Sequence, residues 1–261
     1  MDRLIQKVYF SDSIIEKKSH YHDCHQIILI LSGRIQYCIN NTTYEAHAGN
    51  LLLFSRYENH SINILSPEYK RYVLRLEPVA NSTQSKLYAL LTNRPEGFCN
   101  TIALGDKFAE FENLFERILA EYNGQNTLFD DMYPLLIGQL LIMIYRQIPQ
   151  SPAFDQTVYD IQKQLEGNCS KQYTLEYLSK QYNISVSSLS HRFKRSTGAS
   201  VMEYLLYCRI ALSKNYLMQS DLNIGQIVEK CGFSDSSNFS RSFKKINGIT
   251  PSEFRKKHRT E

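Results

Sequence analysis

The sequence has neither closely spaced cysteines nor a long apolar run. Its six cysteines lie far apart and form no C-x-x-C pair, which excludes a zinc ribbon or a disulfide framework and suits a reducing compartment. The first ten residues, MDRLIQKVYF, lack the apolar core of a signal peptide. The most apolar stretch, residues 135–145, is interrupted by Gly138 and Gln139 and falls short of the ~20 residues that span a membrane. We therefore expect a cytoplasmic protein without membrane contact.

Familiar catalytic motifs are also missing. The sequence contains no G-x-S-x-G, no phosphate-binding P-loop and no H-E-x-x-H. It therefore offers none of the nucleophile, nucleotide or zinc-protease chemistry that these motifs support. We expect a protein that is not an enzyme.

Positive charge is concentrated in the C-terminal part. Residues 1–150 contain 14 Lys/Arg and 16 Asp/Glu, and residues 151–261 contain 16 and 10, so the net charges are −2 and +6. Such asymmetry is expected when one part of a protein binds a polyanion. A chance excess of surface lysines would give the same numbers, so charge alone does not decide.

Residues 1–78 read as a series of short strands. The segments QIILILSG, IQYCI, TYEAHAGNLLLF, SINIL and YKRYVLRLE are apolar or alternating, with turn residues such as Asn40-Asn41 between them. Many short strands separated by turns predict a sandwich or barrel.

Two helices are predicted after the strands. Residues 106–122 carry an apolar stripe with spacings of 3, 4, 3 and 4, and residues 129–147 are apolar nearly all round. The pair could simply cover the barrel, or it could also form a dimer seam. The seam residues would be Phe108, Phe111, Phe115, Ile118 and Tyr122.

A proline-containing segment, residues 149–154, is the best linker candidate. It divides the chain into two predicted domains, residues 1–148 and 155–261. In the first, the barrel covers about 1–78 and the helices about 106–147. The fold class is α+β, with a cupin-like barrel and helical extension followed by an all-α domain.

The C-terminal part contains an internal repeat, the strongest signal in the chain. TLEYLSKQYNIS (residues 174–185) matches NIGQIVEKCGFS (223–234) at an offset of 49 residues. LSHRFKRSTGASVMEY (189–204) matches FSRSFKKINGITPSEF (239–254) at an offset of 50. The second copy therefore has one extra residue in its turn.

Each copy has the layout of a helix-turn-helix unit. In the turn, Asn183 and Gly232 occupy the position that needs a left-handed backbone. Ser185 and Ser234 follow as helix N-caps or their neighbours. The second helix should bury two residues four apart on one face. The expected buried residues are Leu189 and Phe193 in the first copy and Phe239 and Phe243 in the second.

The opposite face of each second helix carries short polar and basic side chains. Short polar residues let a helix lie deep in the major groove, where Arg and Asn bind guanine and adenine edges. Lysines and helix N-termini hold phosphates. An ordinary solvated face would explain one copy, but two matching copies in the basic part of the chain favour DNA binding.

Residues 155–258 resemble the DNA-binding domain of the AraC/XylS family of transcription regulators. GFSDSSNFSRSFKKINGITPSEFR (232–255) carries most of the family signature. The resemblance implies a long helix over residues 200–219 that joins the two units and places their second helices in successive major grooves. It also implies promoter DNA and RNA polymerase as partners, most often in activation. By position, the base readers are Ser187, Ser190, His191, Ser237, Asn238 and Arg241, and the phosphate contacts are Ser185, Lys194, Ser234, Lys244 and Lys245.

Residues 15–78 resemble the two motifs of the cupin barrel. His20-x-His22 is followed by Gln26 and Gly33, and the second motif ends in His60. In cupin enzymes the corresponding histidines and a glutamate bind a metal. Here the neutral Gln26 stands at the glutamate position, so such a site would lose charge and affinity.

Three interpretations of these histidines stay open. They could hold a metal as three-histidine sites do, line an effector pocket as the resemblance to AraC-like proteins implies, or be hydrogen-bonded in the barrel without any ligand. We expect an effector pocket without a metal cofactor, formed by His20, His22, His25, Gln26 and His60.

Two functional classes compete at this stage. The first is a homodimeric transcription regulator whose barrel binds a small effector and changes how the DNA-binding units are presented. The second is a metal-dependent cupin enzyme fused to a DNA-binding domain. The amide at the glutamate position and the missing catalytic motifs favour the first.

Overall fold

The computed structural model describes residues 5–14, 17–39, 42–77, 91, 100–124, 127–148 and 155–259. It divides into two compact units, one of Met1–Asp155 and Arg195–Gly198 and one of Gln156–Lys194 and Ala199–Glu261. We call residues 5–148 the barrel unit and residues 155–259 the helical unit. The predicted linker, residues 149–154, and the Asn40-Asn41 turn lie outside the described residues.

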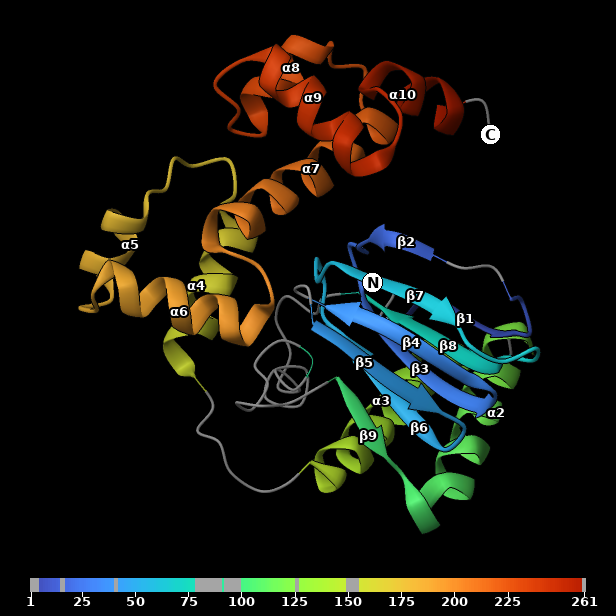
Figure 1. Cartoon of the computed structure of the whole chain (residues 1–261). Helices are drawn as coiled ribbons and strands as arrows, with labels where there is room; N and C mark the ends of the chain where they lie inside the picture. Colours follow the sequence, from blue (N-terminus) through green and yellow to red (C-terminus); the bar gives the residue numbers. More distant parts are fainter. Residues whose placement is uncertain are drawn as a thin grey trace. The chain divides into compact units, whose positions relative to one another are not determined.

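The barrel unit contains two antiparallel sheets (Figure 1). One has the strand order β1-β8-β3-β6-β9 and the other the order β2-β7-β4-β5. This confirms the predicted domain of short strands, and β9 is an addition to the prediction. The strands are β1 (Ile5–Ser11), β2 (Lys17–His20), β3 (His25–Ser32), β4 (Arg34–Ile39), β5 (Thr42–His47), β6 (Asn50–Phe54), β7 (His60–Ile64), β8 (Lys70–Leu76) and β9 (Thr101–Ala103).

Strand β3 is buried on both faces, which explains its continuous apolar sequence. Side chains alternate between the faces of a strand. Ile28 and Ile30 belong to the core between the two sheets, whereas Ile27 and Leu29 belong to a second core on the outer face of the five-stranded sheet. A strand covered on both sides shows no polar alternation.

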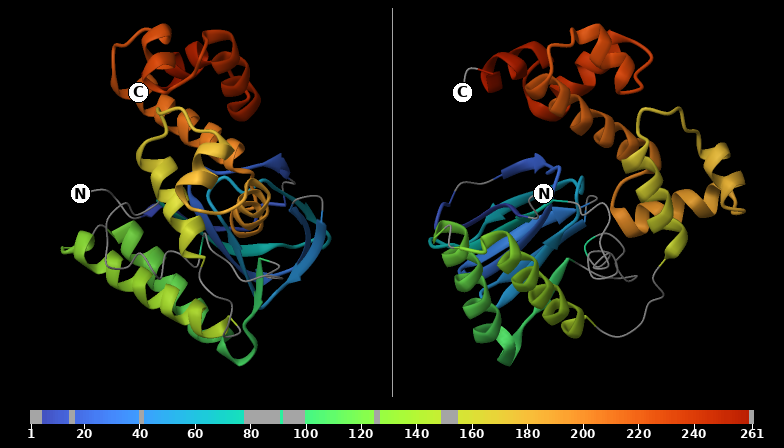
Figure 2. Two further views of the ribbon diagram at one scale, coloured as in Figure 1. Left: turned by 90° about the vertical axis from the view of Figure 1, so that its left-hand side faces the viewer. Right: turned by 180° about the vertical axis from the view of Figure 1, so that it is seen from behind.

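Helices α2 (Phe108–Gly124) and α3 (Phe129–Gln147) lie side by side against the five-stranded sheet, preceded by the short 3-10 helix η2 (Gly105–Lys107) (Figure 2). Their position corrects the predicted dimer seam. Phe111, Phe115 and Ile118 are at most 1% exposed, and Phe108 and Tyr122 pack against the same core. The spacing of 3 and 4 showed an apolar helix face, but this face packs on the chain's own sheet.

The helical unit consists of seven described helices: α4 (Gln156–Gly167), α5 (Leu175–Gln181), α6 (Val186–Thr197), α7 (Val201–Gln219), α8 (Ile224–Lys230), α9 (Ser236–Asn247) and α10 (Pro251–Arg259). The long helix α7 runs from the group α4–α6 to the group α8–α10 (Figure 1). This confirms the prediction of two helix-turn-helix units joined by a helix. Within the described part of the chain, no helix has the length and apolar character required to cross a membrane.

Candidate functional site

Both turns of the helix-turn-helix units have the same backbone geometry. Asn183 and Gly232 have φ angles of 53° and 76°, as predicted. Ile184 N donates to the Ser179 carbonyl at 3.0 Å, and Phe233 N donates to the Val228 carbonyl at 3.1 Å. These bonds close a Schellman motif at the end of each first helix, which a left-handed residue makes possible.

The second helix of each unit begins at a side-chain cap, and the structure shows which residue is the cap and which is its neighbour. Ser185 caps α6, because its hydroxyl accepts a hydrogen bond from Ser188 N at 3.1 Å. The cap of α9 is Asp235, whose carboxylate accepts from Asn238 N at 2.7 Å. Ser234 is the neighbour of the cap and is therefore the extra residue of the second turn. The hydrogen bond from Asn238 N lowers the pKa of Asp235.

The helices that follow are capped in matching ways as well. Ser200 and Glu203 form a capping box at the start of α7, and Thr250 and Glu253 exchange equivalent hydrogen bonds at the start of α10. Hydrogen bonds from the cap residues lower the pKa of both glutamates. The repeat therefore extends through the first turn of the third helix in each copy.

The buried and exposed faces of α6 and α9 agree with the predicted pattern. Leu189, Phe193, Phe239 and Phe243 are 0% exposed. All eleven predicted DNA contacts lie on or before these two helices and are exposed, apart from the half-buried Ser190. They are Ser185, Ser187, Ser190, His191 and Lys194 in the first unit and Ser234, Ser237, Asn238, Arg241, Lys244 and Lys245 in the second.

The offset of 50 residues between the second helices points to one residue, Ser188, that the predicted set of base readers left out. With Ser185 matched to Asp235, Asn238 corresponds to Ser188 and Arg241 to His191. The predicted base-reading positions of α9 thus carry an amide and a guanidinium, whereas the corresponding positions of α6 carry a hydroxyl and an imidazole. The second unit has the longer, more directional hydrogen-bonding groups.

The two helix-turn-helix units are tied together by hydrogen bonds. Arg209, in the middle of α7, donates from Nε to the Cys169 carbonyl and from Nη2 to the Lys171 carbonyl, each at 2.8 Å. Gln172 Nε2 donates to the carbonyl of Gly232 at 3.0 Å. The loop after α4 in the first unit is therefore held against the turn of the second unit. Sequence spacing gave no signal of these contacts.

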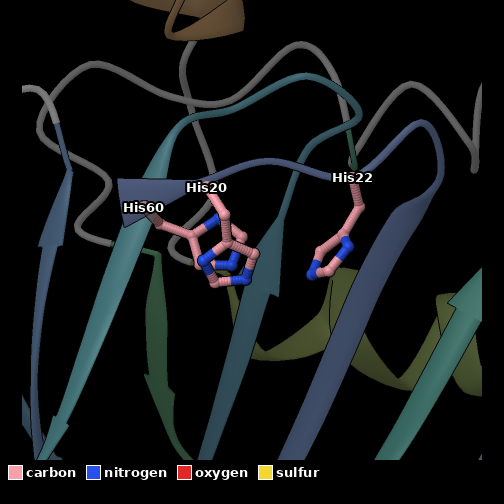
Figure 3. A group of neighbouring side chains, drawn as sticks. All are labelled: His20, His22 and His60. Atoms are coloured by element: carbon pink, nitrogen blue, oxygen red, sulfur yellow. The ribbon is translucent and has the colours of Figure 1, made fainter. Parts of the chain in front are cut away.

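Three predicted pocket residues form a cluster in the barrel unit. His20, His22 and His60 each offer a ring nitrogen, and these atoms all lie within 4.8 Å of one another. The ring centroids of His20 and His60 are 4.5 Å apart, and those of His20 and His22 are 4.9 Å apart. Figure 3 shows the three rings grouped at one end of the strands.

A small cavity adjoins this cluster. Its volume is about 20 Å³, the space of about one water molecule. Of the five predicted pocket residues, His20 and Gln26 line it. The hydroxyl of the buried Tyr69 has no hydrogen-bond partner among the residues that the structure describes. Burial raises the pKa of Tyr69 to about 12. The complete lining is Tyr9, His20, Gln26, Ile28, Ile62, Tyr69, Arg71 and Val73.

His25 lies elsewhere, which corrects the predicted pocket. Side chains alternate along β3, so His25 lies on the opposite face from Gln26. Its Nδ1 accepts a hydrogen bond from Arg56 N at 3.1 Å, and the residue is 3% exposed. His25 is therefore a hydrogen-bonded core residue.

A two-sheet barrel with a unit of two helix-turn-helix motifs defines a class of DNA-binding regulators. Comparison with family models gives two matches, to a helix-turn-helix domain over residues 178–257 and to an AraC-like ligand binding domain over residues 13–134. The chain belongs to the AraC/XylS family. This family consists of transcription factors, which decides against the fused-enzyme alternative.

Named relatives span most of the chain. The transcriptional activator RhaS of Salmonella arizonae is 24% identical over 90% of this chain and 86% of that protein. The transcriptional activator RhaR of Salmonella schwarzengrund is 24% identical with the same coverage. The structure of ToxT from Vibrio cholerae has a TM-score of 0.58 at 16% identity and covers 95% of each chain. A ToxT structure with a bound unsaturated fatty acid has a TM-score of 0.55 at 17% identity, covering 98% of this chain and 97% of that one.

Proposed function

We propose that this protein activates transcription at specific promoters in response to a small effector bound in the barrel. The observation that carries the proposal is the pair of helix-turn-helix units with matching architecture, each with an exposed polar helix face. Activation is supported by the relatives, RhaS and RhaR, which are named transcriptional activators. Because the proposed target is promoter DNA, we also propose that the protein acts in the cytoplasm and that RNA polymerase is its partner.

DNA recognition is assigned to α6 and α9, with unequal shares. In α9, Asn238 and Arg241 read bases while Lys244 and Lys245 hold phosphates. In α6, Ser187, Ser190 and His191 read bases over a shorter reach, and Lys194 holds a phosphate. Ser185 and Ser234, at the exposed helix starts, complete the phosphate contacts.

The effector site is assigned to the cavity beside the histidine cluster. His20, Gln26 and Arg71 supply polar groups there, among apolar side chains of the inner core. A few polar groups in an apolar lining are typical of small-molecule sites, but such sites have volumes of about 300–1,000 Å³. The cavity of about 20 Å³ would therefore have to widen when an effector binds. ToxT has a structure with an unsaturated fatty acid bound, which supports a small organic molecule as the ligand of such a barrel.

Dimerisation is assigned to the outward face of α3. Leu128, at its N-terminus, is 70% exposed, Leu135 is 68% exposed, and Met132 and Ile142 are about 40% exposed. With the exposed Gln139, these positions follow spacings of 4, 3, 4 and 3, the pattern of a coiled-coil seam. A second copy of the same helix presents the same stripe, so we propose a homodimer through α3.

The experiment that tests DNA reading is selection of binding sequences from a random pool, followed by titration of variants on the selected DNA. Arg241→Ala should weaken specific binding by ~1–3 kcal/mol and relax the preference at one base pair. Arg117→Ala is the matched control, since Arg117 is also exposed but lies on α2 of the barrel unit. An unchanged sequence profile for Arg241→Ala would remove this residue from the base readers.

A further inference from the structure

The histidine cluster has the composition of a metal site. His20 ends β2, His60 begins β7, and the two are paired across the sheet, while His22 follows two residues after His20. Three imidazole nitrogens within 4.8 Å of one another are drawn from two strands and a loop (Figure 3). Among the residues that the structure describes, no carboxylate or thiol belongs to this group.

Packing and a backbone carbonyl fix the orientation of His60. Its ring stacks on Phe54, with centroids 4.1 Å apart and planes 13° apart. Its Nδ1 lies 2.9 Å from the carbonyl oxygen of Glu58. With the proton on Nδ1 donated to this carbonyl, Nε2 is the ring nitrogen that carries the lone pair. A backbone carbonyl in this role is a common way of orienting histidine ligands.

The spacing of the rings is close to what coordination requires. Bond lengths of 2.0–2.1 Å in tetrahedral geometry separate ligand nitrogens by about 3.3 Å. The nitrogens here need to approach by up to ~1.5 Å. Rotation about the χ angles of the half-buried His20 and His22 would have to supply this movement, because the buried His60 is held in place. Close packing of three aromatic rings would produce similar centroid distances without any ligand. Convergence of one nitrogen from each ring is the feature that packing alone does not require.

We propose that His20, His22 and His60 bind one divalent transition-metal ion. Imidazole ligands select zinc, nickel, copper or cobalt, whereas magnesium and calcium require oxygen ligands. Three histidines leave the fourth position of the ion open. Because His20 also lines the cavity, the ion would lie at the edge of the proposed effector site. Metal binding itself does not depend on the proposed function. Only its regulatory consequence rests on that proposal.

The direct test is metal binding by the full chain, purified without a polyhistidine tag and stripped with a chelator. We expect one Zn²⁺ per chain in calorimetric titration and one Co²⁺ with the absorption of a nitrogen-ligated site. His20→Gln and His22→Gln should each weaken binding at least tenfold, since even residues behind the ligands contribute about 10–100-fold. His47→Gln is the matched control, because His47 is an exposed histidine of β5 outside the cluster.

Several outcomes would overturn the metal site. One is the absence of stoichiometric Zn²⁺ or Co²⁺ binding by the wild type. Another is equal affinity in the His22→Gln and His47→Gln variants. A third is a cobalt–thiolate charge-transfer band, which would place the ion on cysteine. Circular dichroism shows whether each cluster variant folds. If one does not, the cobalt spectrum of the wild type and a zinc-dependent rise in its Tm test whether the metal site exists.

DNA binding separates the failure of this inference from failure of the proposed function. Sequence-specific binding by a protein that takes up no metal would refute the metal site and leave the regulator intact. Metal binding that leaves DNA affinity unchanged would support the site and refute its regulatory role.

Discussion

Gly232 is the residue of the second turn that alanine cannot replace. Its φ of 76° lies in the left-handed region, where a side chain costs about 1–2 kcal/mol. A Cβ atom there would also lie 2.2 Å from the carbonyl oxygen of Ser170 and 2.7 Å from its carbonyl carbon. Arg209 holds the carbonyls on both sides of Ser170. The clash is therefore with a fixed backbone and cannot be relieved by a rotamer change.

The expected cost of Gly232→Ala is about 2–5 kcal/mol, which adds about 1–3 kcal/mol of overpacking to the conformational cost. Gly248→Ala is the matched control. Gly248 has a φ of 77°, but nothing lies within 4 Å of an added Cβ atom. This control should therefore show the conformational cost alone. The difference in free-energy cost between the two variants measures the energy of the clash with the backbone of Ser170.

Hydrogen exchange of the full chain, read by mass spectrometry, is the suitable assay because it reports local opening. Amides of α8 and α9 in Gly232→Ala should exchange at least ~30-fold faster than in the wild type, since 1.36 kcal/mol corresponds to a factor of ten. DNA affinity should fall with them. Equal protection of the amides from hydrogen exchange in Gly232→Ala and Gly248→Ala would refute the reasoning. It would show that the backbone around Ser170 can move away from an added Cβ atom at little cost.

Three further predictions test the contacts described above. Arg209→Ala removes both hydrogen bonds to the first unit, so affinity for DNA with two half-sites should fall at least about tenfold, with little change for a single half-site in mobility-shift titration. Asp235→Ala should lower the Tm of the helical unit at neutral pH, and Asp235→Asn should keep it, since Asn caps equally well. Because the folded pKa of Asp235 is depressed, its contribution is present above the unfolded pKa and is lost as pH falls through the folded one; Asp235→Asn should lack this acid-dependent loss in melts from pH 7 to 3. Leu135→Asp with Ile142→Asp should give folded monomers in sedimentation, whereas Phe111→Asp should unfold the barrel; a persistent dimer would reject the α3 seam.

The sequence predicted best those features that depend on local geometry. Apolar spacing located the helices, and the repeat located the left-handed residues Asn183 and Gly232. These positions follow from backbone sterics and from periodic burial, which act within a few residues. The sequence left open whether Ser234 is the cap of α9 or its neighbour, because Ser234 and Asp235 are both good N-caps. Only the hydrogen bond to Asn238 N distinguishes them.

Features set by distant contacts could not be predicted in the same way. An apolar helix stripe does not reveal whether it packs on the chain's own sheet, as Phe115 does, or on a second chain. The spacing of a cupin motif brought His20, His22 and His60 together correctly but could not show that His25 lies on the other face of β3. The pairing of Arg209 with the loop after α4 joins residues about 40 positions apart, where no local pattern exists.

These contacts determine how the two units can meet DNA. Helix α7 has 19 residues, so at about 1.5 Å per residue it is about 28 Å long, shorter than the ~34–36 Å between successive major grooves on one face of B-DNA. The hydrogen bonds of Arg209 and Gln172 restrain the two units against moving apart. If α7 also holds the recognition helices α6 and α9 closer together than one helical turn of DNA, straight DNA would not fit both equally well. Either the DNA would bend towards the protein, at a cost of a few kcal/mol, or one helix would make looser contacts. We expect the second arrangement, because the exposed side chains of α6 are shorter than those of α9, and we therefore propose that specificity is concentrated at Asn238 and Arg241.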